Sequence, residues 1–166
     1  MPADPVAAAV VAGLVARGET LATAESLTGG LIGGALTTVP GASAAYRGGV
    51  ITYATDVKRV LVGVPADVLA SAGVISSATV TAMAVGVREA IGASWGLSVT
   101  GVAGPDPQEG HQPGEVWVGL VGPGFPAAAL RFDLAGDRDR VRAATVAEAL
   151  GWLAAELAAP ATSTKG

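Results

Sequence analysis

Cysteine is absent from this chain of 166 residues, and histidine occurs once, as His111. The lack of cysteine excludes disulfide bonds, thiol catalysis and thiolate metal ligands. One histidine does not suffice for a histidine-based zinc site, and it weakens the case for a Ser-His-Asp triad. We therefore expect no metal site built from these residue types.

Positive charge, aromatic side chains and long apolar runs are also scarce. Ten Lys and Arg residues stand against 14 Asp and Glu residues, the net charge is −4, and aromatic residues make up 4% of the chain. Proteins that bind nucleic acid usually need basic patches or stacking rings, so we expect no nucleic-acid partner. The longest apolar run, residues 6–16, is too short to cross a bilayer, and Asp4 precedes it where a signal peptide has basic residues. We expect a soluble, cytoplasmic protein that does not bind membranes.

The pattern of apolar residues predicts an α/β protein with one domain. Helices are expected at about residues 6–16, 31–38, 57–61, 65–69, 77–91 and 138–157, and strands at about residues 20–23, 50–53, 95–100, 116–121 and 128–132. Helices alternate with strands in the first two thirds, and two strands then follow in succession. This order predicts a mixed sheet that is parallel where helices cross over and antiparallel at the late hairpin.

One octapeptide, Thr23-Ala24-Glu25-Ser26-Leu27-Thr28-Gly29-Gly30, joins an expected strand to an expected helix. Such a turn exposes a side chain next to the unpaired N–H groups and the positive dipole end of the helix. Ser26 and Thr28 place two hydroxyls there, and Gly29 and Gly30 let a ligand approach the backbone closely. The alternative interpretation is that a serine or threonine simply caps the helix.

A serine nucleophile needs a neighbouring base, and the chain offers lysine rather than histidine for this role. Lys58 follows Tyr53 by five residues, just past an expected strand end. Burial lowers the pKa of a lysine and lets it accept a proton, and Tyr53 would pass protons or hold the pair in place. Glu25 would orient Lys58 or an arginine, or would simply face solvent. The alternative is that Lys58 is solvated and Tyr53 belongs to the core or a strand surface.

A second candidate is the loop Thr100-Gly101-Val102-Ala103-Gly104-Pro105. Backbone N–H groups in a glycine-rich loop at a strand end bind phosphates or oxyanions, although the loop can also be a structural turn. Sites of α/β sheets lie at the carboxyl ends of the strands, so residues 26–30, 53–58 and 100–105 compete for the site. Arg138, Arg140 and Arg142 are expected to form a solvated face.

Five motifs together resemble, in order and spacing, the C-terminal domain family of the competence/damage-inducible protein CinA. They are Ala24-Glu25-Ser26-x-Thr28-Gly29-Gly30, Val39-Pro40-Gly41, Tyr53-x4-Lys58-x2-Leu61-x-Gly63-Val64, Thr100-Gly101-Val102-Ala103-Gly104-Pro105 and Gly136-Asp137-Arg138-x2-Val141-Arg142. The resemblance runs from about Leu21 to Leu150. It implies a three-layer α/β/α sandwich with a mixed, mostly parallel sheet, formed by a single amidase domain over residues 1–159 with a frayed tail over residues 160–166.

The resemblance also implies an activity, namely hydrolysis of the carboxamide of nicotinamide mononucleotide (NMN) to nicotinate mononucleotide and ammonia. Such enzymes serve pyridine-nucleotide salvage and need no metal or other cofactor. Carried over residue by residue, Ser26 is the nucleophile, and Tyr53 and Lys58 handle protons. The residues implied to bind substrate are Glu25, Thr28, Gly29, Gly30, Thr100, Gly101 and Gly104.

The sequence departs from the family pattern at two places. Leu27 stands where the family often has cysteine, and His111-Gln112-Pro113-Gly114 stands where many relatives carry a basic Lys-Pro-x-Gly segment. A phosphate contact from that lysine is therefore not implied here. The chain resembles the stand-alone form, without the large N-terminal domain of longer relatives.

Two other functions stay open at this stage. The same loops can hold a nucleotide without turnover, as in a regulatory binding module. The second alternative is an accessory role in competence or the DNA damage response, although the acidic charge balance argues against direct DNA contact. Helix surfaces rich in alanine, glycine and valine favour a homodimer.

Overall fold

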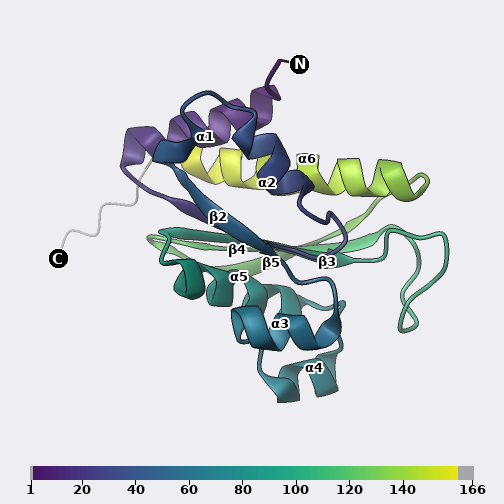
Figure 1. Ribbon diagram of the computed structural model, residues 1–166. Helices are drawn as coiled ribbons and strands as arrows, with labels where there is room; N and C mark the ends of the chain where they lie inside the picture. Colours follow the sequence, from purple (N-terminus) through teal and green to yellow (C-terminus); the bar gives the residue numbers. More distant parts are fainter. Residues whose placement is uncertain (1, 161–166) are drawn as a thin grey trace.

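The structure is a computed structural model that describes residues 2–160 (Figure 1). Its elements are α1 (Pro5–Arg17), β1 (Leu21–Glu25), α2 (Leu31–Thr37), a short 3-10 helix (Ala42–Ala44), β2 (Tyr46–Ile51), α3 (Thr55–Val62), α4 (Ala66–Ala72), α5 (Ser77–Ile91), β3 (Trp95–Gly101), β4 (Glu115–Gly122), β5 (Phe125–Asp133) and α6 (Arg138–Ala158). Of the tail that was expected to fray, residues 161–166 lie outside the described part.

The strands form one sheet in the order β2-β1-β3-β4-β5. Strand β1 pairs in parallel with β2 and β3, whereas β4 pairs antiparallel with β3 and β5. Four strands therefore point the same way and β4 alone opposes them. Helices α1, α2 and α6 cover one face of the sheet, and α3, α4 and α5 lie on the other (Figure 1). The predicted three-layer α/β/α fold with a mixed, mostly parallel sheet is confirmed.

Two hydrophobic clusters hold the layers together. The larger one joins the sheet to α1, α2 and α6, and a smaller one joins it to α3 and α5. Strand β1 is buried along its whole length, as is nearly all of β3, and both consist mainly of apolar or small residues. Because β1, β2, β3 and β5 run in one direction, the segments that follow them emerge at the same edge of the sheet.

The second strand ends earlier than the sequence predicts. The expected strand at residues 50–53 is β2, which closes at Ile51, and the N–H of Thr52 then donates to the Glu25 carbonyl oxygen at 2.8 Å. Helix α3 begins at Thr55 with Ala54 as its N-cap. The early end leaves residues 52–54 outside the ladder, at the edge where β1 and β3 also end.

Glycine allows helix α5 to lie close to helix α3. A Cβ atom added at Gly86 would overlap the carbonyl oxygen of Val62, whereas one at Gly151 in α6 would meet nothing. We expect Gly86→Ala to lower the free energy of unfolding by about 1–3 kcal/mol, because backbone of α3 would have to move. The matched Gly151→Ala should raise it by up to about 1 kcal/mol through helix propensity. Urea titration measures both, and a Gly86→Ala protein as stable as the parent would contradict this packing.

Candidate active site

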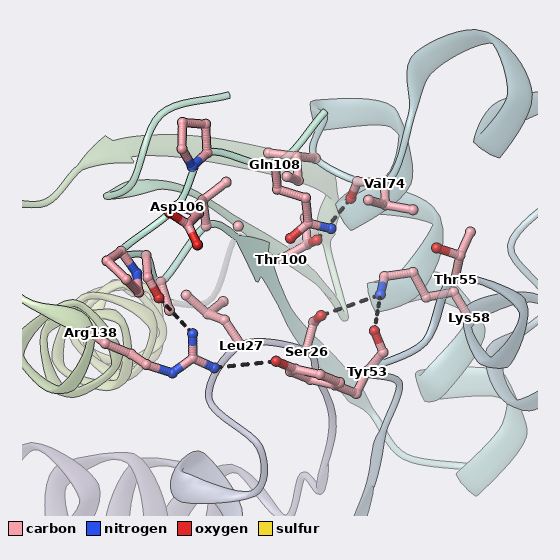
Figure 2. A pocket seen from close by; sticks show the side chains of 17 residues that line it. Ser26, Leu27, Tyr53, Thr55, Lys58, Val74, Thr100, Asp106, Gln108 and Arg138 are labelled. Carbon is pink, nitrogen blue, oxygen red and sulfur yellow. Dashed lines mark hydrogen bonds between the residues drawn. The ribbon is translucent and has the colours of Figure 1, made fainter. Parts of the chain in front are cut away.

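A pocket of about 370 Å³ opens at the sheet edge where these strands end (Figure 2). Its walls come from the segment after β1, the β2–α3 connection with the start of α3, the α4–α5 loop, the loop after β3 and the start of α6. The lining residues are Ser26, Leu27, Tyr53, Thr55, Lys58, Val74, Ile75, Thr100 to Gln108 and Arg138. The three strand ends that competed in the sequence therefore meet in a single pocket.

Ser26 is the first residue after β1 and reaches the pocket through a tight turn. Its N–H donates to the Val99 carbonyl oxygen at 3.2 Å, which extends the contact between β1 and β3 by one residue. Its own carbonyl oxygen accepts from the N–H of Gly29 at 3.1 Å. These backbone contacts fix the Ser26 side chain, which is 8% exposed, at the floor of the pocket.

Lys58 on α3 provides the partner of Ser26. Its Nζ is 3.3 Å from Ser26 Oγ, 2.7 Å from the Thr52 carbonyl oxygen and 3.4 Å from that of Tyr53 (Figure 2). The side chain is 2% exposed, and burial lowers the pKa of Lys58 to about 8, against a smaller opposing effect of the Glu109 carboxylate. When the amine is neutral, its two N–H groups remain on the two carbonyl oxygens and its lone pair faces Ser26. The predicted Ser26–Lys58 pair is thus present with the geometry of a nucleophile and its base.

The lowered pKa of Lys58 makes stability depend on pH in a defined direction. Between about pH 8 and its ordinary value of 10.5, the unfolded chain binds this proton and the native protein does not. The free energy of unfolding therefore gains a contribution that rises with pH across this window. We expect urea titrations to show the parent gaining stability relative to Lys58→Met between pH 8 and 10.5. A difference that stays constant with pH would show that Lys58 keeps its ordinary pKa.

Glu25 and Thr28 hold the turn and do not line the pocket. The Glu25 carboxylate accepts from the Thr28 hydroxyl at 2.7 Å and from the N–H groups of Ile32 and Gly33 at 2.9 and 3.0 Å. It therefore caps the start of α2, and its contacts are with this helix rather than with Lys58. The predicted contacts of Glu25 and Thr28 with substrate stay predictions.

Gly29 and Gly30 adopt backbone conformations that other residues avoid, with φ values of +56° and +105°. Neither residue lines the pocket, so their part in substrate binding also stays a prediction. On the outer side of this turn, the Arg142 guanidinium donates to the carbonyl oxygens of Leu27 and Thr28 at 3.0 and 3.4 Å. The expectation that Arg142 belongs to a solvated face is wrong, because it ties α6 to the Ser26 turn.

The loop after β3 lines the opposite wall. Thr100, Gly101 and Gly104 all line the pocket, as the sequence predicts for ligand-binding residues. The Thr100 hydroxyl donates to the Val74 carbonyl oxygen at 2.8 Å and so ties β3 to the α4–α5 loop. Within residues 2–160, the N–H groups of Ala103 and Gly104 have no hydrogen-bond acceptor, which makes them available to a ligand.

Arg138 is a charged pocket residue that the sequence did not assign to the site. It begins α6, and its guanidinium donates to the Gly104 carbonyl oxygen at 2.7 Å and to the Tyr53 hydroxyl at 3.2 Å (Figure 2). Arg138 is exposed, as expected of a solvated face, and it also reaches the pocket, because β5 runs parallel to β1 and delivers its following segment to the same edge. The sequence feature that could have indicated this position is the predicted late hairpin, because its second strand returns the chain to this edge just before Arg138.

Tyr53 and His111 are placed differently from the reactive pair. The Tyr53 side chain is 62% exposed, and its hydroxyl contacts Arg138 rather than Ser26 or Lys58. His111 Nδ1 lies 3.0 Å from Glu115 Oε2 and does not line the pocket. Residues 111–114 therefore place no side chain against this pocket.

Residues 2–160 contain no group of three or more His, Cys, Asp or Glu residues arranged to hold a metal ion. None of the helices described is both long enough and apolar enough to cross a membrane.

Comparison with known sequences identifies one family. The profile of the CinA C-terminal domain family matches residues 3–157. A CinA-like protein of Frankia casuarinae is 51% identical over 148 residues, which cover 89% of this chain and 34% of that protein. A CinA-like protein of Myxococcus xanthus is 47% identical over 161 residues, which cover 96% and 38%. The chain thus spans a little over a third of the length of these curated relatives.

Solved structures give the same result. A CinA superfamily protein from Klebsiella pneumoniae superposes with a TM-score of 0.90 at 33% identity, covering 95% of this chain and 99% of that one. A competence/damage-inducible protein from Agrobacterium tumefaciens superposes with a TM-score of 0.86 at 34% identity, covering 90% and 92%. These likenesses confirm the resemblance that the sequence motifs predict.

Proposed function

This chain belongs to the CinA C-terminal domain family, and we propose that it is an amidohydrolase that converts NMN to nicotinate mononucleotide and ammonia. The observation that carries the proposal is the contact between Lys58 Nζ and Ser26 Oγ at 3.3 Å inside the pocket. Burial of a lysine costs folding free energy, and lysines with a lowered pKa cluster at functional sites. A lysine of this kind beside a serine is suited to activate the serine hydroxyl. Pyridine-nucleotide salvage is the process such a reaction would serve.

The reaction would proceed through an acyl-enzyme. Neutral Lys58 takes the proton of the Ser26 hydroxyl as Oγ attacks the carboxamide carbon, and a tetrahedral intermediate forms. The resulting ammonium of Lys58 then gives its proton to the leaving nitrogen, so that the C–N bond breaks and ammonia departs. Water, activated by Lys58 in the same way, hydrolyses the ester and restores Ser26.

Backbone N–H groups would stabilise the negative oxygen of the intermediate. Within residues 2–160, the N–H groups of Leu27, Ala103 and Gly104 lack an acceptor, and all three residues line the pocket. The N–H of Ser26 itself is excluded, since it is bonded to Val99. Preorganised donors of this kind act where charge develops during the reaction.

The size and charge of the pocket suit a small anionic amide. About 370 Å³ lies in the range of small-molecule sites. Its lining carries two cations, Lys58 at the nucleophile and Arg138 across the pocket from it, and one carboxylate, Asp106. A substrate with its amide at Ser26 and a phosphate at Arg138 matches this lining.

The test is to incubate the purified protein with NMN in the presence of a chelator and to measure ammonia and nicotinate mononucleotide together. Equal amounts of both products are expected, with rates proportional to the protein concentration. A thermal shift with NMN but no product would instead support the regulatory binding module and contradict the amidase. Absence of both responses would contradict both functions.

A further inference from the structure

We propose that Tyr53 is a positioning residue whose hydroxyl holds Arg138 as the anion-binding group of the pocket, rather than a carrier of protons to or from Ser26. The inference deepens the proposed function and rests on it, because it states how the same pocket would select a phosphorylated amide over the same amide without a phosphate. Its basis is the set of contacts around Tyr53, Arg138 and Gly104.

The Tyr53 hydroxyl is placed away from the reacting atoms. It accepts a hydrogen bond from Arg138 Nη2 at 3.2 Å, and within residues 2–160 no hydrogen bond joins it to Ser26 or Lys58. The contact of Tyr53 with Lys58 is made by its backbone carbonyl oxygen, at 3.4 Å. The three hydrogen-bond partners of Lys58 Nζ are the Ser26 hydroxyl oxygen and the carbonyl oxygens of Thr52 and Tyr53. Proton transfer between Lys58 and Ser26 therefore needs no phenol.

Arg138 is held in a geometry that leaves donors for a ligand. A guanidinium carries five N–H groups in a rigid plane. One donates to the Gly104 carbonyl oxygen at 2.7 Å and one to the Tyr53 hydroxyl, so the others remain for a bound anion. Because the Tyr53 oxygen accepts from Arg138, its own O–H is also left to donate. Holding both groups before the ligand arrives reduces the entropy lost on binding.

The distribution of charge in the pocket makes anion binding depend on Arg138 and Tyr53. Figure 2 shows Arg138 and Lys58 on opposite sides of Ser26. Lys58 is enclosed beside the nucleophile, and His111 contacts Glu115 outside the pocket, so within residues 2–160 Arg138 is the cation that lines the far side. Asp106 in the same lining would repel an anion that bound elsewhere along that wall. Anion recognition therefore depends on Arg138 and on whatever fixes its orientation.

The experiment compares NMN with nicotinamide riboside, which has the same amide and no phosphate. Tyr53→Phe and Arg138→Gln should each raise KM for NMN about tenfold or more, because a hydrogen bond to a charged group is lost or misplaced. The kcat for NMN should stay within about threefold, and kcat/KM for the riboside, which has no phosphate for Arg138 to bind, should not show the loss seen with NMN. In the double variant, the loss should be no greater than in Arg138→Gln alone, because the two residues act as one unit.

Tyr46→Phe is the matched control. The Tyr46 hydroxyl contacts the Thr23 hydroxyl at 2.7 Å, and Tyr46 does not line this pocket. Its replacement should leave the ratio of kcat/KM for NMN to kcat/KM for the riboside unchanged. A change in that ratio for Tyr46→Phe similar to the change for Tyr53→Phe would overturn the specific role of Tyr53.

Three outcomes contradict the inference while leaving the amidase intact. They are a kcat loss of a hundredfold or more on both substrates in Tyr53→Phe, unchanged kinetics in Tyr53→Phe, and equal kcat/KM for NMN and riboside in the parent. If the parent hydrolyses neither amide, the proposed function has failed, and calorimetric titration then decides the inference. It stands if the parent binds NMN more tightly than the riboside and Tyr53→Phe loses that preference, and it falls otherwise.

Discussion

Ser26→Ala should reduce the rate of NMN hydrolysis on the order of 10⁴-fold or more, with little change in NMN binding. The loss is large because the hydroxyl forms the covalent bond, and what remains after removal of a nucleophile comes from binding and oxyanion stabilisation alone. Binding should persist because Arg138 and the loop after β3 do not depend on Ser26 Oγ. Initial rates of ammonia release and calorimetric titration with NMN measure the two quantities.

Ser71→Ala provides the control for this variant. Ser71 lies exposed on α4, where its hydroxyl donates to the Asp67 carbonyl oxygen, and it does not line the pocket. Its replacement should leave the rate within about twofold, as is usual for surface substitutions. A Ser26→Ala protein that keeps more than a tenth of the parent rate would rule out Ser26 as the nucleophile.

Lys58→Met should have the second large effect, a loss on the order of 10³-fold or more in kcat. Methionine fills similar space but accepts no proton, so Ser26 loses its base. In the parent, the rate should rise with pH as Lys58 loses its proton and level off above about pH 8, the pKa that burial gives this side chain. The residual rate of Lys58→Met should show no such rise near pH 8.

Two further variants define the role of Lys58. Lys58→Arg keeps a positive charge but cannot act as a base near neutral pH, so it should be as inactive as Lys58→Met. Arg59→Met removes the neighbouring exposed cation and should leave the pH profile unchanged. A parent rate that falls as the pH passes 8, or an active Lys58→Arg protein, would show that Lys58 acts as a cation instead.

The location of the site was accessible from the sequence. Because α/β proteins place their sites at strand ends, the sequence alone makes candidates of the polar segments at residues 26–30, 53–58 and 100–105, and all three reach one pocket region. The contact between Ser26 and a lysine could also be predicted, since one histidine in the chain left lysine as the natural partner for serine. Residue type and chain order carry this information without side-chain coordinates.

The orientation of individual side chains could not be predicted from the sequence in the same way. Glu25 precedes the nucleophile, yet it caps α2 because strand residues alternate between the faces of the sheet and its carboxylate meets the free N–H groups of that helix. Arg138 required the direction of β5, which depends on the register of a hairpin. Tyr53 required the point at which β2 ends, and strand boundaries depend on ladder contacts that a local pattern does not contain.

The most direct test of the central claim is a single-turnover reaction with NMN, quenched in acid at successive times, in which ammonia, free nicotinate mononucleotide and protein-bound acyl group are all measured. We predict that ammonia appears before the free acid and that the difference is found as an ester on the peptide that contains Ser26. Ammonia and acid that rise together with no acyl group on the protein, or an acyl group on another residue, would contradict the assignment of Ser26 as the nucleophile.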